Sequence, residues 1–238
     1  MSLGEIFSDA IKYPFSDITK FLMVGIIALL SGLSSLVMAF KVQNTVVLLL
    51  AAVVSLIFAL FLSGYGVGVI KKGIQRSDEI PDIDPMTNIV NGVKALIIGI
   101  VYFLIPIIIT VILMLITGAI GSGLNHAAAG LGIGLIISII FFIAFAIFET
   151  VAMARFADTD DLGAALSIGE VIEDVKKIGI SQIIAFVIIA FIILVVAYFI
   201  AGLIGLIPFV GIIISSILVG GFVALFYNKA LGLLYSQI

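Results

Sequence analysis

The chain has 238 residues, of which 63% are hydrophobic and 11% are charged, and its formal net charge is -3 at pH 7. Soluble domains contain about 45–50% apolar residues, and a soluble chain of this length does not bury so large an excess. Cysteine is absent, which excludes disulfides, thiolate metal sites and cysteine nucleophiles. Apolar stretches of about 20 residues, each long enough to cross a bilayer, account for this composition and indicate a multi-pass helical membrane protein.

Residues 2–12 are predicted to form a short amphipathic helix. Ser2 and Glu5 have the spacing of a capping box, in which each side chain accepts a hydrogen bond from the backbone N–H of the other residue. Apolar residues then recur at helical spacing: Leu3, Ile6, Phe7 and Ala10. A helix of this length does not span a membrane, so we expect it to lie in the interface and to end at Pro14.

Six predicted spans follow and pair into three hairpins: residues 21–40, 45–70, 95–117, 133–153, 180–204 and a last span that ends near residue 229. The most polar segment, residues 71–94, is expected to contain a short helix with Asp84 as N-cap and Pro85 at its first position. Pro106 predicts a kink in the third span. The expected fold is therefore all-α, a transmembrane bundle of six spans in a single domain, residues 1–238.

One helical segment occurs twice. Residues 167–177 align with residues 2–12 without a gap, and Ser, Gly, Glu, Asp and Lys recur in register. A weaker copy precedes the third span. We interpret the chain as three repeat units, approximately residues 2–76, 77–157 and 158–238, each an amphipathic segment on the cytoplasmic face followed by a helical hairpin.

The cations predict the orientation. Every Lys and Arg except Lys41 falls on the same side of the membrane as the N-terminus in this scheme. By the positive-inside rule, we expect both termini in the cytoplasm and the protein in the plasma membrane. Acidic residues gather on the same side, which disfavours a purely electrostatic attachment to anionic lipid.

Glu149 is the one acidic residue within a predicted span, and a carboxylate at such a depth is either paired or functional. Tyr65, Asn228 and Lys229 are expected at a similar depth on the other hairpins. We predict that these four side chains form a polar cluster at the inner end of the bundle. Two interpretations stay open: the cluster joins the helices, or Glu149 is a proton or substrate site.

The second copy of the amphipathic helix is a candidate contact surface for a cytoplasmic partner. The candidate contact residues on it are Glu170, Glu173, Asp174 and Lys177. Because these acids offset Lys176 and Lys177, a basic protein is a more suitable partner than an anionic lipid surface.

No motif indicates an enzyme, a cofactor or a metal site. His126 is the sole histidine, and one histidine does not build a zinc site. The acidic pairs Asp82/Asp84 and Asp158/Asp160 each precede a predicted helix, so capping explains them better than a divalent cation does. Phosphate-binding and dinucleotide motifs are absent. We expect a protein that is not an enzyme and has no cofactor.

Small residues recur four positions apart in several spans, for example Gly64/Gly68 and Ala28/Gly32, and such pairs are typical of helix-packing faces in lipid. The glycines on either side of Tyr65 have a second interpretation, a break in the second span. Discontinuous helices line transport sites, so such a break would favour a carrier.

Several short motifs resemble one protein family: Tyr13-Pro14-Phe15-Ser16-Asp17, Gly64-Tyr65, Ile80-Pro81, Asn91-Gly92-Val93-Lys94, Tyr102 with Pro106, and Ala154-Arg155-Phe156. Over nearly its whole length, the chain resembles an uncharacterised multi-pass membrane family that is best represented in methanogenic archaea and catalogued as domain of unknown function 4013. The resemblance implies an integral membrane protein and brings no activity, catalytic residue or cofactor with it.

The sequence favours a non-enzymatic membrane-organising protein, or one that binds a protein partner or a lipid. The alternative is a small transporter or channel with its carboxylate site at Glu149. The expected partners are the lipid bilayer first, then a cytoplasmic or membrane protein or a second copy of the chain, and no nucleic acid.

Overall fold

A computed structural model of the chain describes residues 1–123, 127–208 and 210–238, with side chains described except at residues 118–131 and 133. The described residues form helices and connecting segments and no β-strand, which confirms the all-α fold. Five helices in this part of the chain are long and apolar enough to cross a membrane, or six if one strongly bent helix pair counts as a span.

The N-terminal helix α1 (Leu3–Lys12) begins with the predicted capping box. The backbone N–H of Ser2 donates to Glu5 Oε2 at 2.7 Å, and the N–H of Glu5 donates to Ser2 Oγ at 3.3 Å. The apolar side of α1 packs within the protein, where the Phe7 and Phe186 rings stack with centroids 5.2 Å apart. A 3-10 turn, η1 (Tyr13–Phe15), follows α1 directly.

The first predicted span is broken. It consists of α2 (Ile18–Ser31) and α3 (Leu33–Ala39), separated at Gly32. The 14 residues of α2 extend about 21 Å, less than the roughly 30 Å of a hydrocarbon core. The segment formed by α1 and η1 meets α2 at 89°.

A contact from the second span supports this break. The backbone N–H of Ser34, in the first turn of α3, donates to the hydroxyl of Ser55 at 2.8 Å. The first N–H groups of a helix lack a partner within the helix, so Ser55 satisfies a group that the break exposes. The prediction of one continuous helix over residues 21–40 is therefore wrong.

The next two helices are uninterrupted. Helix α4 (Thr45–Ile74) continues through the glycines around Tyr65, so the alternative break predicted there does not occur. Helix α5 (Pro85–Gly123) begins where predicted, with Asp84 Oδ1 accepting from the backbone N–H of Met86 at 3.1 Å. Because no break follows, the short helix expected after Asp84 and the third predicted span are one helix.

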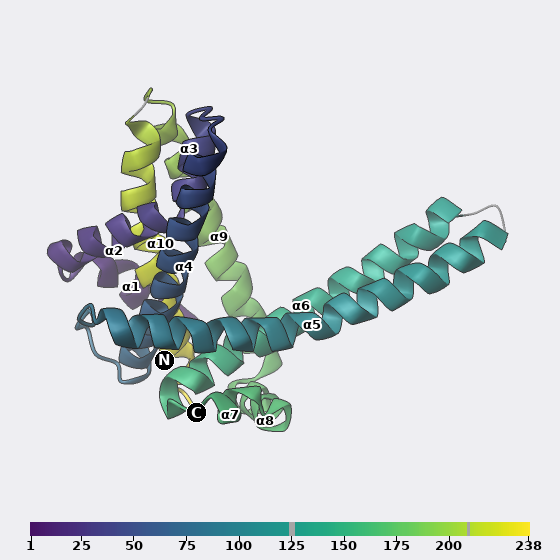
Figure 1. Cartoon of the computed structure of the whole chain (residues 1–238). Coiled ribbons are helices and arrows are strands. Elements are labelled where there is room, and N and C mark those ends of the chain that lie inside the picture. The colour runs from purple at the N-terminus through teal and green to yellow at the C-terminus, as the bar shows by residue number, and fades with distance from the viewer. Residues whose placement is uncertain (124–126, 209) are drawn as a thin grey trace.

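Residues 127–208 and 210–238, as described, form five more helices: α6 (Ala127–Thr159), α7 (Leu162–Leu166), α8 (Ile168–Ile178), α9 (Ile180–Gly205) and α10 (Gly211–Tyr235). Helix α10 is central and packs against α1, α2, α4, α6 and α9. Both termini lie at one end of this bundle near α7 and α8, and the α9–α10 connection lies at the other end (Figure 1).

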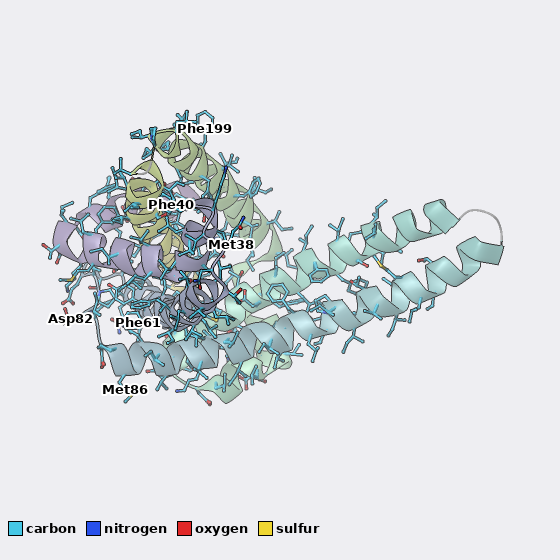
Figure 2. All side chains as sticks on the ribbon, turned by 45° about the horizontal axis from the view of Figure 1, so that its top comes forward. Met38, Phe40, Phe61, Asp82, Met86 and Phe199 are labelled. Atoms are coloured by element: carbon cyan, nitrogen blue, oxygen red, sulfur yellow. The ribbon has the colours of Figure 1, made fainter. Side chains whose placement is uncertain are left out.

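The hairpin of α5 and α6 leans away from the bundle. Figure 1 shows it extending sideways from α4, α9 and α10 rather than standing parallel to them. Its side chains project outward along the arm, whereas Met86, near the start of α5, and Asp82, just before it, lie at the opposite edge of the molecule (Figure 2). The exposed side chains of the arm are mostly apolar, including Ile108, Ile112 and Ile140.

Three helix crossings are so close that a side chain does not fit between the backbones. A Cβ added at Gly92 on α5 would lie 1.9 Å from the carbonyl oxygen of Leu60 on α4. The facing glycines are Gly64 and Gly92 where α4 crosses α5, Gly25 and Gly221 where α2 crosses α10, and Gly73 and Gly232 where α4 crosses α10. These crossings position the helices that surround the candidate site.

Candidate functional site

A groove of about 680 Å³ lies between α2, α4, α9 and α10. This volume is in the range of ligand sites in proteins, about 300–1,000 Å³. Among the described residues, no charged side chain lines the groove, and its apolar walls include Leu62, Leu194 and Val219. Hydroxyl and amide groups are nevertheless numerous in it: Ser31, Ser63, Tyr198, Ser215, Ser216, Tyr227 and Asn228.

Three of the serine hydroxyls, those of Ser31, Ser215 and Ser216, bond to their own helices. Ser31 Oγ donates to the carbonyl of Ala28 at 2.7 Å. Ser215 and Ser216 both donate to the carbonyl of Ile212, at 3.0 and 2.7 Å. Such bonds to the preceding turn are common for serine in helices. Since each hydroxyl proton is used, the oxygens keep acceptor capacity toward the groove.

Asn228 is held between α10 and α4. Its Nδ2 donates to the carbonyl of Ala224 at 2.7 Å. On the opposite side lies Gly66 of α4, where an added Cβ would lie 2.8 Å from the same nitrogen. The absence of a side chain at Gly66 therefore leaves the space that the amide occupies, and the Asn228 side chain lines the groove.

The four residues of the predicted polar cluster lie at different places. Asn228 lines the groove, whereas Tyr65 and Lys229 both donate to the segment between α4 and α5. Glu149 on α6 is half-buried, and no hydrogen bond or ion pair joins it to the other three among the described residues. The structure thus joins Tyr65 and Lys229 to one segment, with Asn228 against Gly66 beside them, and places Glu149 on another helix.

The segment that Tyr65 and Lys229 hold, residues 77–84, is termed the strap. Five consecutive strap carbonyls each accept a hydrogen bond from a side chain. The pairs are Lys229 Nζ with Ser77 (2.5 Å), Ser16 Oγ with Asp78 (3.2 Å), Tyr13 OH with Glu79 (2.9 Å), Lys20 Nζ with Ile80 (2.7 Å) and Tyr65 OH with Pro81 (2.9 Å). The ammonium of Lys229 is tolerated at 1% exposure because, besides the Ser77 carbonyl, it has the Asp78 carboxylate at 3.7 Å and the centroid of the Tyr13 ring at 4.6 Å. Residue types do not predict the strap contacts, because the acceptors are backbone carbonyls.

The predicted contact helix, α8, is attached by one buried carboxylate. Asp174 is buried and accepts hydrogen bonds from Arg155 Nη1 at 2.6 Å, Tyr235 OH at 2.7 Å and Lys177 Nζ at 3.2 Å. Burial acts to raise the pKa of Asp174, but these three hydrogen bonds outweigh it and hold the pKa below its usual value of 3.8. Arg155 also pairs with Glu170.

The residues of α8 therefore divide into two groups. Asp174 faces the protein interior and is not available to a partner. Glu170, Glu173 and Lys177 are exposed, although Glu170 is paired with Arg155.

The acidic pairs of the sequence do not converge. Asp82 pairs with Lys20 at 2.7 Å, which lowers the pKa of the Asp82 carboxyl. Asp84 caps α5, and Asp160 pairs with Lys71. In the part of the chain that the structure describes, no three His, Cys, Asp or Glu residues are arranged to hold a metal ion. His126 lies outside the described residues.

The model of one protein family, described as "Protein of unknown function (DUF4013)", matches residues 47–206, more than half of the chain. The matched part begins in α4 and ends just after α9, so it includes two of the four helices around the groove. No curated protein and no solved structure matches the chain.

Proposed function

The chain belongs to this family of proteins of unknown function, DUF4013, and we propose that it is a non-enzymatic multi-pass membrane protein that binds a lipid in the groove. The observation that carries the proposal is the hydroxyl and amide lining of a cavity between apolar helices. Polar groups in hydrocarbon are costly unless a partner satisfies them. Within a bilayer, lipids are the abundant molecules whose polar groups could hydrogen-bond to this lining.

The surroundings of the groove support a lipid rather than a water-soluble ligand. Tyr198 lines the groove and is 62% exposed, and its neighbours on α9, Val196 and Phe199, are 53% and 65% exposed. The groove therefore adjoins the apolar outer surface of the bundle. A lipid chain lying on this surface reaches the groove without crossing water.

We further propose that the protein lies in the plasma membrane with both termini in the cytoplasm. The distribution of cations supports this orientation. Both termini and α8 lie at one end of the bundle (Figure 1). Lys41, the one cation expected on the outer side, lies in the connection between α3 and α4.

Filling the groove tests the proposed function. Ala201 on α9 lines the groove, whereas Ala52 on α4 is exposed and lies outside it. Native mass spectrometry of protein purified in mild detergent is expected to find a retained lipid on the wild type and on Ala52→Phe. Ala201→Phe is expected to lose it, because the added ring occupies the cavity. Equal lipid retention by Ala201→Phe would contradict a lipid site in this groove.

A second candidate, a small transporter, has one observation in its favour: the broken first span adjoins the groove, since Ser31 at the end of α2 lines it. Discontinuous helices are typical of transport sites. For this candidate Glu149 carries the proton. Proteoliposomes with an internal pH dye would then lose proton flux on Glu149→Gln while the melting temperature stays that of the wild type. A lost fold would favour a structural role for Glu149.

A protein partner at the cytoplasmic face is a further proposal, and the exposed side of α8 is its candidate surface. That surface comprises Glu170, Glu173 and Lys177, without Asp174. Charge reversal at Glu173, which leaves the Arg155 pairs intact, would change the capture of a basic partner if this surface binds one.

A further inference from the structure

We infer that the groove selects an uncharged lipid alcohol, such as a diacylglycerol, over phospholipids. This inference rests on the proposed lipid-binding function and specifies the ligand class of the same groove. Two features of the lining support it. Among the described residues, the lining has no cationic side chain, and several of its hydrogen-bond acceptors have no partner in the protein.

The lining has nothing to neutralise a phosphate. No Lys, Arg or His is among the residues that line the groove in the described structure. The nearest cation in sequence, Lys229, follows Asn228 but directs its ammonium to the strap carbonyl of Ser77 at 2.5 Å. A phosphate buried without a cation to neutralise it is strongly disfavoured.

The lining leaves several acceptor positions open. Ser31, Ser215 and Ser216 have each given their proton to a carbonyl of their own helix. The amide of Asn228 has likewise donated one proton to Ala224 and keeps its carbonyl oxygen as an acceptor. A ligand that satisfies this lining must therefore bring a hydrogen-bond donor, and a phosphodiester headgroup such as phosphatidylcholine has none.

A lipid alcohol meets both conditions. Its hydroxyl donates to a serine or Asn228 oxygen, and an ester carbonyl accepts from the hydroxyl of Tyr198, which also lines the groove. Its acyl chains lie along the exposed apolar surface of α9, where Val196 and Phe199 flank the groove.

Photo-crosslinking tests this selectivity. The full chain is placed in phosphatidylcholine nanodiscs that contain, at equal mole fraction, a diacylglycerol or a phosphatidate with the same diazirine-bearing acyl chain. Labelled peptides are then identified by mass spectrometry. Diacylglycerol is expected to label α9 and α10 peptides around the groove roughly tenfold more than phosphatidate, a factor typical of one or two well-made hydrogen bonds.

The variants identify the lining as the cause. Ser215→Ala with Ser216→Ala removes two acceptors and is expected to bring the two probes to within about twofold of each other. Ser138→Ala is the matched control, because Ser138 is buried on α6 and also donates to its own helix, at 2.7 Å, but does not line the groove.

Two results would overturn the inference. Equal or stronger groove labelling by phosphatidate in the wild type contradicts selection of an alcohol while leaving a lipid site intact. Labelling by neither probe contradicts the inference and the proposed function together.

Discussion

Asp174 joins three helices through its carboxylate. It lies on α8 and accepts hydrogen bonds from Arg155 on α6 and Tyr235 on α10. The exposed charges around it are screened by water and contribute little to the folding stability. Removing one partner of a buried ion pair, in contrast, destabilises the protein strongly. The position of α8 on the bundle therefore depends on this residue more than on any charge that a partner would contact.

Asp174→Asn is expected to destabilise the protein by about 3 kcal/mol, because it leaves Arg155 without its buried counter-charge. For a chain of this size, this corresponds to a fall of roughly 6–12 °C in the melting temperature. Thermal unfolding in detergent, followed by circular dichroism, measures the change. The control is Glu173→Gln at an exposed position of the same helix, where a change within about 0.5 kcal/mol is expected. Equal effects of the two variants would show that the network does not hold α8.

The same carboxylate predicts an acid limit of stability. In the folded protein the pKa of Asp174 is below its usual value of 3.8, and the unfolded value is about 3.9. The ionised carboxylate of Asp174 therefore contributes its full share of the folding stability above the unfolded pKa. This stability is lost as the pH falls through the folded pKa. Melting temperatures measured from neutral pH down to about pH 3 should converge for the wild type and Asp174→Asn at the acid end. A constant difference over that range would contradict this assignment.

At the scale of the helix, backbone contacts at glycines decide how the elements pack. Gly92→Ala is expected to destabilise by about 1–3 kcal/mol, since its Cβ would lie 1.9 Å from the Leu60 carbonyl oxygen and α4 and α5 must separate. Gly99 on the same helix has no atom within 4 Å of an added Cβ, and Gly99→Ala is expected to stabilise the helix slightly. Unfolding midpoints in a detergent titration compare the two. An unchanged unfolding midpoint for Gly92→Ala would contradict so close a crossing of α4 and α5.

The strap is the other element with a specific test. Tyr65→Phe removes one hydrogen bond to the Pro81 carbonyl and is expected to speed hydrogen exchange of residues 77–84 by about two- to tenfold. Tyr198→Phe, which removes an exposed hydroxyl on α9, is the control and should leave this exchange unchanged. Unaltered exchange in Tyr65→Phe would mean that the remaining donors hold the strap without it.

Sequence patterns predicted the elements where local chemistry decides them. The capping box at Ser2 and the N-cap at Asp84 are read from residue type and spacing, and both are found. Local patterns do not predict the break at Gly32, because the Ser34 N–H that it exposes is satisfied by Ser55 on another helix. Tyr13 and Tyr65, which donate to the strap, and Pro81 within it stand in the family-like motifs, but their common role appears only in three dimensions.

For the whole molecule, depth along a helix proved insufficient to predict the site. The sequence predicts Glu149 and Lys229 at one level of the bundle, yet Lys229 donates to the strap and Glu149 is on α6, part of the hairpin that leans away (Figure 1). Hydropathy gives the length of a span but neither its rotation nor its tilt. The groove was not predicted for the same reason, since its lining comes from four helices whose facing sides the sequence does not specify.

The central claim is that a lipid occupies the groove between α2, α4, α9 and α10. An electron cryo-microscopy structure of the full chain in a lipid nanodisc tests it most directly. The account predicts elongated density in the groove, with its polar end within hydrogen-bond distance of Ser216 or Asn228. A groove closed by inward packing of α9, with no density between the four helices, would contradict it.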